Sequence, residues 1–254
     1  MALACEGLTV AVPGRVLVAD LEFAVEPGSF VCVLGENGSG KTLTLHTLAG
    51  LREPSRGRVR LVDDWLDAQP RRIRARRLGL LTQHDEDPFP SSVLESALIG
   101  RHPHVDFWRW ESSDDVRIAR TALERADLAG FERRSVATLS GGERRRLALA
   151  TVLAQEPDVY LLDEPLNHLD PHHQLDVLRL FAAEARAGKT VLASLHDVNL
   201  AANFADFVLL LFGDGDWLYG PAGAVLSREN LSRLYHLPME QFEAGGRRIF
   251  LAAS

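Results

Sequence analysis

One stretch of this 254-residue chain combines residue types that together bind phosphate groups. It reads Gly35-Glu-Asn-Gly-Ser-Gly-Lys-Thr42 and fits the phosphate-binding loop pattern G-x-x-x-x-G-K-[ST]. Glycines let backbone N–H groups close on a phosphate, and the positive end of the following helix points to the same place. Lys41 supplies a mobile positive charge, and the Thr42 hydroxyl is a ligand for magnesium. We therefore predict nucleotide contacts from Gly35, Glu36, Asn37, Gly38, Ser39, Gly40, Lys41 and Thr42.

Two adjacent carboxylates follow a second apolar run. Asp163 and Glu164 come directly after Val159-Tyr-Leu-Leu. A carboxylate at the end of a buried strand can hold magnesium, as in the Walker B arrangement, and a second one can orient or deprotonate an attacking water. An Asp-Glu pair could instead cap a helix, but the phosphate-binding loop upstream favours catalysis. We predict Asp163 as a magnesium ligand and Glu164 as the general base.

A second anion-binding sequence lies at Leu139-Ser-Gly-Gly-Glu143. Ser-Gly-Gly at the start of a helix offers free N–H groups, a hydroxyl and a helix dipole to an anion. One loop of the chain already holds phosphates, so this second site calls for a second copy of the chain. We expect Ser140, Gly141 and Gly142 to contact the nucleotide of that copy.

The elements that must position these residues alternate between strands and helices. Several short, continuous apolar runs occur in the chain, and such runs are typical of strands that are buried on both faces of a parallel sheet. Two alternating stretches before the loop, Leu3 to Val12 and Arg15 to Val25, predict antiparallel strands. The expected sheet strands are Phe30–Leu34, Leu78–Gln83, Val159–Asp163, Thr190–Leu195 and Phe207–Phe212.

Residues 88–135 predict a helical insertion in an α/β domain, because helical segments follow one another there without a strand pattern. Residues 1–87 and 136–254 then form the core of one domain. The insertion contains His102-Pro-His104, which we interpret as part of a loop because no cysteine or carboxylate partner is near in sequence. It also contains Phe107-Trp-Arg-Trp110, for which local packing and an interaction patch are equal alternatives.

The composition is that of an ordinary globular protein, with 46% hydrophobic and 25% charged residues. A formal net charge of −7 gives no global attraction to nucleic acid, so no nucleic-acid partner is expected. The basic run Arg71–Arg77 is accordingly interpreted as a solvated helix face. No apolar run is long enough to cross a membrane, and Cys5 and Cys32 are expected to be buried, reduced thiols. We expect a cytosolic protein that is soluble when isolated.

Six motifs together resemble those of the ATP-binding subunits of ABC transporters, in the same order and over essentially the whole chain. The resemblance implies an α/β fold, a P-loop NTPase of ABC type with a mostly parallel core sheet, an N-terminal antiparallel β subdomain and a helical insertion. It also implies ATP and Mg²⁺ as cofactors, and a head-to-tail homodimer that holds each ATP between one P-loop and the partner's Ser-Gly-Gly. The six motifs are Gly35–Thr42, Gln83, Leu139–Gly142, Asp163-Glu164, Asn167–Asp170 and His196.

The resemblance assigns roles that the spacing of residues alone does not. It implies that Gln83 contacts magnesium and the attacking water, that His196 contacts the γ-phosphate, and that Asp170 shapes the contact between the two sites. Without the resemblance, His196 is only a plausible polar residue at the end of a strand. The chain departs from the family pattern at Val12, where an aromatic residue usually stacks on adenine, so we expect aliphatic contacts to the base. Two further positions depart from the family pattern: Glu143 replaces the usual glutamine of the Ser-Gly-Gly motif, and Leu166 stands where threonine is common. Neither departure removes a catalytic group.

Three sequences resemble the importer group that serves iron–siderophores, haem and cobalamin: Asn167–Asp170, Leu195–Ala202 and Gly100–His104. This implies separate transmembrane permease subunits that dock on the insertion, an indirect link to a substrate-binding protein, and a peripheral position at the cytoplasmic face of the inner membrane. We therefore expect an ATPase that energises uptake of a metal chelate. The alternatives are the ATPase of an exporter with separate membrane subunits, or a non-transport ABC ATPase acting on nucleic acid or a protein assembly.

Overall fold

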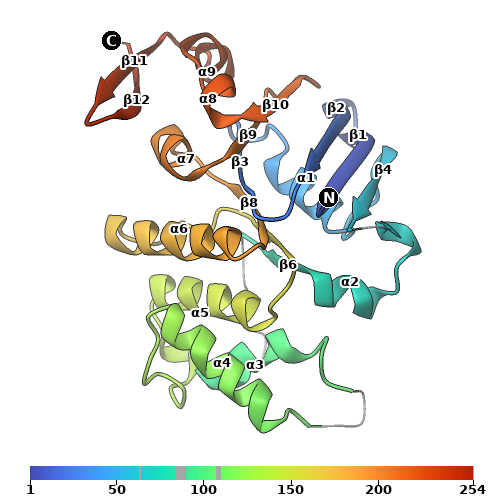
Figure 1. Ribbon diagram of the computed structural model, residues 1–254, viewed down its shortest axis with the longest axis vertical. Helices are drawn as coiled ribbons and strands as arrows, with labels where there is room; N and C mark the ends of the chain where they lie inside the picture. The colour runs from blue at the N-terminus through green and yellow to red at the C-terminus, as the bar shows by residue number, and fades with distance from the viewer. Residues whose placement is uncertain (63, 84–89, 107–109, 254) are drawn as a thin grey trace.

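A six-stranded sheet forms the centre of the computed structural model, which describes residues 1–62, 64–83, 90–106 and 110–253 (Figure 1). The strand order is β10-β9-β3-β8-β7-β6. All neighbours from β9 to β6 are parallel, and β10 pairs antiparallel with β9 at one edge. The predicted, mostly parallel core sheet is therefore confirmed. The strands are β3 (Phe30–Leu34), β6 (Leu78–Leu81), β7 (Val159–Leu162), β8 (Thr190–Ser194), β9 (Phe207–Leu211) and β10 (Trp217–Pro221).

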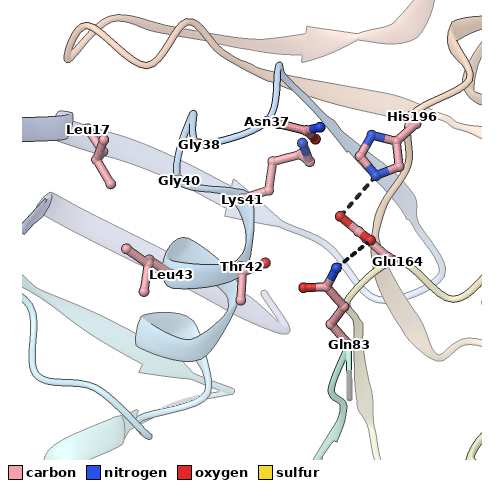
Figure 2. Close-up of a pocket in the computed structure, with 10 residues that line it drawn as sticks. All are labelled: Leu17, Asn37, Gly38, Gly40, Lys41, Thr42, Leu43, Gln83, Glu164 and His196. Carbon is pink, nitrogen blue, oxygen red and sulfur yellow. Dashed lines mark hydrogen bonds and ion pairs between the residues drawn. The ribbon is translucent and has the colours of Figure 1, made fainter. Parts of the chain in front are cut away.

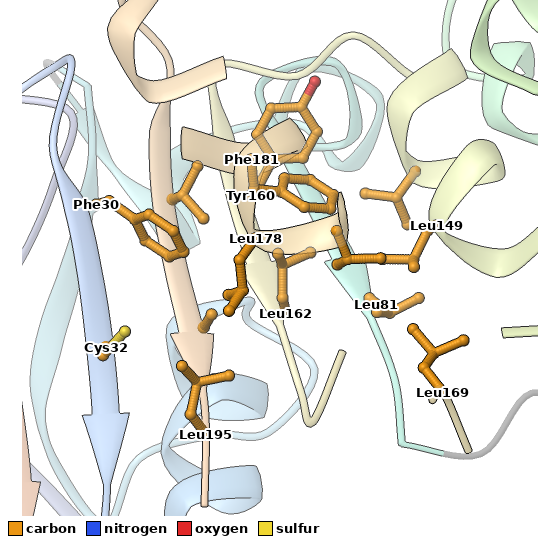
Figure 3. Close-up of a cluster of buried hydrophobic side chains, with 14 of the residues drawn as sticks. Phe30, Cys32, Leu81, Leu149, Tyr160, Leu162, Leu169, Leu178, Phe181 and Leu195 are labelled. Atoms are coloured by element: carbon orange, nitrogen blue, oxygen red, sulfur yellow. The ribbon is translucent and has the colours of Figure 1, made fainter. Parts of the chain in front are cut away.

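Both faces of the parallel strands are buried, which explains why these strands are almost continuously apolar, whereas the edge strand β10 is only partly buried. Successive side chains of β3 alternate between two hydrophobic cores: Phe30 and Cys32 lie in one, and Val31 and Val33 lie in the other. The first core packs under helices α5 to α7, as Figure 3 shows for part of it. The second lies between the sheet, α1 and the N-terminal strands. These helices are α1 (Lys41–Leu48), α5 (Gly141–Ala154), α6 (Pro171–Arg186) and α7 (Val198–Phe204).

The N-terminal strands form a separate sheet in the order β2-β1-β4-β5. Strand β1 pairs antiparallel with both β2 and β4, as the alternation of apolar residues predicted. The turn between β1 and β2 places Val12 opposite Arg15, and Gly14 adopts a φ of 78°, which a glycine reaches without strain. The strands are β1 (Leu3–Val12), β2 (Arg15–Val25), β4 (Arg56–Leu61) and β5 (Asp64–Trp65), and the short 3₁₀ helix η1 (Leu66–Ala68) follows.

The regular elements that the structure describes between β6 and α5 are all helices, joined by turns and loops, and this region lies at the end of the molecule remote from the N-terminal sheet (Figure 1). Ser92 and Ser112 begin its two α-helices with capping boxes, each completed by an acidic residue three positions on. The expected loop at 85–90 falls largely outside the described residues, as do positions 107–109 of the aromatic cluster. The elements are α3 (Val93–Leu98), η2 (Ile99–Arg101), α4 (Ser113–Arg125) and η3 (Val136–Thr138).

The basic run forms helix α2 (Arg71–Arg77), and none of its residues is buried. The interpretation as a solvated face is nevertheless incomplete. Arg72 and Arg76 both donate hydrogen bonds to the carbonyl oxygen of Pro103, at 3.0 and 2.8 Å, and Arg72 also reaches the carbonyl of Val105 at 2.7 Å. The run therefore joins the core to the helical region, a contact that local sequence did not indicate.

The C-terminal segment adds two helices and a hairpin beyond the core sheet (Figure 1). Asn199 on α7 anchors the hairpin, because its amide group exchanges two hydrogen bonds with the backbone of Phe250, at 3.1 and 2.8 Å. No helix among the described residues is both long enough and apolar enough to span a bilayer. The elements are α8 (Ala222–Val225), α9 (Arg228–Tyr235), β11 (Met239–Ala244) and β12 (Arg247–Ala252).

Candidate active site

The phosphate-binding loop connects the end of β3 to the start of α1, as the sequence predicted. Gly38 and Gly40 have φ values of 79° and 104°, in the region that favours glycine. A Cβ atom on Gly35 would lie 2.3 Å from Ser39 Oγ and 2.7 Å from the carbonyl oxygen of Leu211, so only glycine fits there. The loop therefore needs its glycines to form the turn that precedes the N-terminus of α1.

The loop forms one wall of a cavity of about 590 Å³. The strand order β3-β8-β7-β6 brings the carboxyl ends of four parallel strands side by side at this cavity, so residues far apart in sequence meet. Figure 2 shows Lys41 and Thr42 on one side, facing Gln83, Glu164 and His196 on the other. The complete lining is Leu17, Asn37, Gly38, Gly40, Lys41, Thr42, Leu43, Gln83, Glu164 and His196.

The Lys41 side chain lies against the backbone of the phosphate-binding loop. Its side chain is buried, and Nζ donates hydrogen bonds to the carbonyl oxygens of Gly35 and Glu36, at 2.7 and 3.1 Å. Burial lowers the pKa of this ammonium group, and the negative charges of Glu164 and Asp163 oppose that shift. The arrangement places a cation in the cavity wall, where its donors can turn toward a phosphate.

Asp163 fits the role of a cation ligand. Its side chain is completely buried, and Oδ1 accepts a hydrogen bond from Ser194 Oγ at 2.8 Å. Within the described residues, no donor reaches the other oxygen, Oδ2. A buried carboxylate oxygen without a donor costs free energy that a bound cation or its water shell can offset, so the residues present fit a magnesium ion. Ser194 is a site residue that the sequence analysis missed.

Glu164 is the centre of a polar cluster. Gln83 Nε2 donates to Glu164 Oε2 at 2.9 Å, and His196 Nε2 lies 2.9 Å from Oε1 (Figure 2). Asn167 Nδ2 also donates to Oε2. Burial acts to raise the Glu164 pKa, yet hydrogen bonds from Asn167 and His196, with the positive charges of His196 and Lys41, hold it below its usual value. This carboxylate is therefore ionised at neutral pH and can accept a proton.

The Ser-Gly-Gly sequence lies elsewhere on the molecule. Ser140 is the N-cap of α5 and forms a capping box with Glu143. Neither it nor its two glycines lines the cavity; a Cβ on Gly142 would instead lie 3.2 Å from the carbonyl of His168. Asp170 is the N-cap of α6 and binds the backbone N–H of His173 at 3.0 Å. The predicted residues thus fall into a group at the cavity and a second surface near 140–142 and 168–170. Within the first group, Gly35, Glu36, Ser39 and Asp163 are close to lining residues in the chain but do not line the cavity themselves.

Two predictions outside this site also have an outcome. His104 Nε2 lies 2.9 Å from the carbonyl oxygen of Gln155, so this ring contacts the end of α5, as expected for a structural loop residue. Cys5 and Cys32 are buried free thiols, as predicted, and burial raises the pKa of both, to about 12 for Cys5. Both thiols are therefore protonated and unreactive at neutral pH.

The sequence matches the ABC transporter family over residues 18–167. The chain belongs to this family. A haemin import ATP-binding protein of Pseudomonas aeruginosa is 40% identical over 240 residues, which cover 92% of each chain. The ferric enterobactin transport ATP-binding protein of Escherichia coli is 35% identical, over 91% of this chain and 86% of that protein.

Solved structures agree with the family assignment. A chain of a metal-chelate type ABC transporter, in an inward-facing conformation, superposes with a TM-score of 0.86 at 30% identity, covering 100% of this chain and 98% of its own. A bacterial ABC transporter cassette solved as a dimer gives a TM-score of 0.76 at 25% identity, over 87% and 98% of the two chains. The protein is thus an ABC-type ATPase, and the predicted fold class is confirmed.

Proposed function

We propose that this chain is the ATP-hydrolysing subunit of an ABC importer that takes up a metal chelate, such as haem or an iron–siderophore. The observation that carries the hydrolytic part is the Glu164 carboxylate, held by Gln83 and His196 across the cavity from the phosphate-binding loop. The relatives named for haemin import and ferric enterobactin transport support the class of transported compound.

ATP binds with its phosphates in the P-loop. The loop N–H groups and the N-terminus of α1 bind the β- and γ-phosphates, and Lys41 turns its donors from the loop carbonyls to phosphate oxygens. Leu17 and Leu43 supply aliphatic surface beside the loop, consistent with a base held without a stacked aromatic. The contacting loop residues are Gly35, Glu36, Asn37, Gly38, Ser39, Gly40, Lys41 and Thr42.

Asp163, Thr42 and Gln83 would hold the magnesium ion, which would neutralise charge on the phosphates when bound. Glu164 accepts a proton from the water whose oxygen attacks the γ-phosphorus, while the bond to the ADP oxygen breaks. Gln83 orients this water, and His196 donates to the γ-phosphate. Because the Glu164 pKa is low, the carboxylate is ready for this role without prior deprotonation.

The residues outside the cavity act on a second copy. In a head-to-tail homodimer, Ser140, Gly141 and Gly142 of one chain cover the γ-phosphate bound in the other, and Asp170 shapes the contact between the two sites. The exposed N-terminus of α5 supports this arrangement, because its N–H groups can serve an anion that its own chain does not hold. The dimeric cassette among the structural neighbours supports it as well.

The helical region at 88–135 docks separate transmembrane permease subunits at the cytoplasmic face of the inner membrane, and a substrate-binding protein acts on those subunits rather than on this chain. Residues 1–87 and 136–254 form the ATP-binding core. An exporter ATPase with separate membrane subunits is the second candidate, but the importers among the relatives favour uptake.

Reconstitution tests this proposal. The chain is purified together with its permease subunits and placed in proteoliposomes with the matching binding protein and haem, a ferric siderophore or cobalamin. We expect magnesium-dependent ATP hydrolysis that one chelate class stimulates, together with uptake of that chelate. Hydrolysis without uptake of any chelate would contradict the importer role, and an absence of hydrolysis would contradict the ATPase role.

A further inference from the structure

A buried arginine on α5 binds the backbone next to the hydrolytic cluster without lining the cavity itself. Arg145 is only 5% exposed, and it lies five residues after Ser140. Its Nη1 donates to the carbonyl oxygen of Thr82 at 2.7 Å. Its Nη2 donates to the carbonyl oxygens of Asp163 and Glu164, at 2.6 and 2.8 Å. One guanidinium group therefore binds the backbone at the carboxyl ends of both β6 and β7.

These three carbonyl groups belong to, or adjoin, the residues whose side chains meet in the cavity. Thr82 directly precedes Gln83, and Asp163 precedes Glu164. Glu164 has a φ of 48°, in the left-handed region that a non-glycine residue adopts only at a cost in free energy. Its carbonyl is bound by Arg145, and its N–H donates to Ser194 Oγ at 2.8 Å, so contacts on both sides hold this conformation.

We propose that Arg145 is a positioning residue for ATP hydrolysis. It fixes the ends of β6 and β7 so that the Gln83 and Glu164 side chains remain at hydrogen-bond distance. Because Arg145 belongs to the helix that begins at Ser140, it also links the surface offered to the partner's nucleotide to the hydrolytic carboxylate of its own chain. This inference rests on the proposed function, in which Glu164 is the general base.

The contacts of neighbouring arginines show that this role is specific to one position. Arg144 donates to the carbonyls of Leu139 and Ala137, and Arg146 binds Asp127; in the described part of the chain, neither side chain forms a hydrogen bond to β6, β7 or the residues that end them. A planar guanidinium can bridge two strand ends with its Nη1 and Nη2 donors, whereas a lysine ammonium offers its donors from a single nitrogen. The proposal therefore predicts that charge alone does not replace Arg145.

The test compares Arg145→Gln and Arg145→Lys with the wild-type protein. We expect kcat to fall by about tenfold to a hundredfold in Arg145→Gln, since a displacement of about 1 Å in a catalytic group has that effect. Arg145→Lys should recover only part of the loss. Binding of ATP, measured by titration, should change by less than about twofold because the P-loop is untouched. The control is Arg228→Gln, which replaces an exposed arginine on α9 that forms an ion pair with Glu229 and has no role in the cavity or in the helical region.

A double-mutant cycle separates positioning from a merely structural role. If Arg145 acts through Glu164, adding Arg145→Gln to Glu164→Gln should lower the residual hydrolysis by less than about twofold. The inference would be overturned if the double variant lost kcat by the full product of the two single losses. It would also be overturned if either Arg145 variant bound ATP more weakly than the wild-type protein. If Arg145→Gln does not fold, Arg145→Lys carries the same cycle. If Arg145→Gln and Arg145→Lys both kept the wild-type kcat, the inference would be overturned and the ATPase role would stand. If the wild-type protein did not hydrolyse ATP, the ATPase role itself would be overturned.

Discussion

Replacing Glu164 by glutamine tests the proposed general base with little disturbance to the cavity. The amide has the shape of the carboxylate, but it presents one acceptor oxygen instead of two. In the wild-type protein, one carboxylate oxygen of Glu164 accepts hydrogen bonds from Gln83 and Asn167, and the other oxygen lies beside His196. Glutamine can keep the contacts on one side only, so we expect a loss of about 1 kcal/mol in stability.

The effect on hydrolysis should be much larger. An amide cannot take a proton from water, and a positioned general base contributes about 10²- to 10⁴-fold to a rate, or roughly 3–5 kcal/mol of transition-state stabilisation. Phosphate release under saturating ATP and magnesium measures kcat, and a titration with labelled ATP measures affinity. Lys41 and Thr42 are unchanged, so the affinity should stay close to that of the wild-type protein.

Glu124→Gln is the matched control, because this exposed glutamate on α4 lies away from the cavity. It should hydrolyse ATP at the wild-type rate. A Glu164→Gln protein with wild-type turnover would refute the assignment of the base. A protein that loses ATP affinity in parallel with kcat would refute the argument that Glu164 acts in the chemical step.

Two further substitutions follow from the described contacts. Lys41→Ala should weaken ATP binding about tenfold to a hundredfold, since a charged hydrogen bond to phosphate contributes roughly 1.5–3 kcal/mol; an unchanged titration would contradict this. Asp115→Ala should lower the free energy of unfolding by about 2 kcal/mol near neutral pH, because hydrogen bonds from Ser112 and the charge of Arg101 lower the Asp115 pKa to about 2. This contribution is present above the unfolded pKa and disappears as pH falls from about 4 toward 2, so the difference from wild type in urea unfolding should shrink over that range. The control, Asp114→Ala, removes an exposed carboxylate whose ion pair is with Arg117, and it should change the free energy of unfolding at neutral pH by less than about 1 kcal/mol.

Much of the fold was predictable because its signals are local. The apolar runs before Gly35 and Asp163 identified two strands of the core sheet, and the alternation in residues 3–25 identified the antiparallel strands. The spacing of the phosphate-binding loop predicted a turn that the positive φ values of its glycines confirm. These features depend on residues that are neighbours in the chain.

The hydrogen bonds that hold the site residues in place were not predictable, because they join residues that are far apart in sequence. Ser194 reaches Asp163 across two adjacent strands, and Arg145 reaches Thr82 from another helix. A run of three arginines in the sequence gives no sign that one of them is buried, since its burial depends on how α5 packs against β6 and β7. The contact between Arg72 and Pro103 was missed for the same reason.

The central claim is that each ATP site is shared between two copies of the chain, and mixing two inactive variants tests it most directly. Lys41→Ala damages the P-loop side of a site, and Ser140→Arg damages the partner-facing side, so each should be nearly inactive alone at an ATP concentration close to the wild-type Kd. A mixed dimer would contain one site in which both sides are intact. The account predicts that an equal mixture regains hydrolysis, up to about a quarter of the wild-type sites when copies pair at random. A mixture no more active than the two separate variants would contradict a shared site.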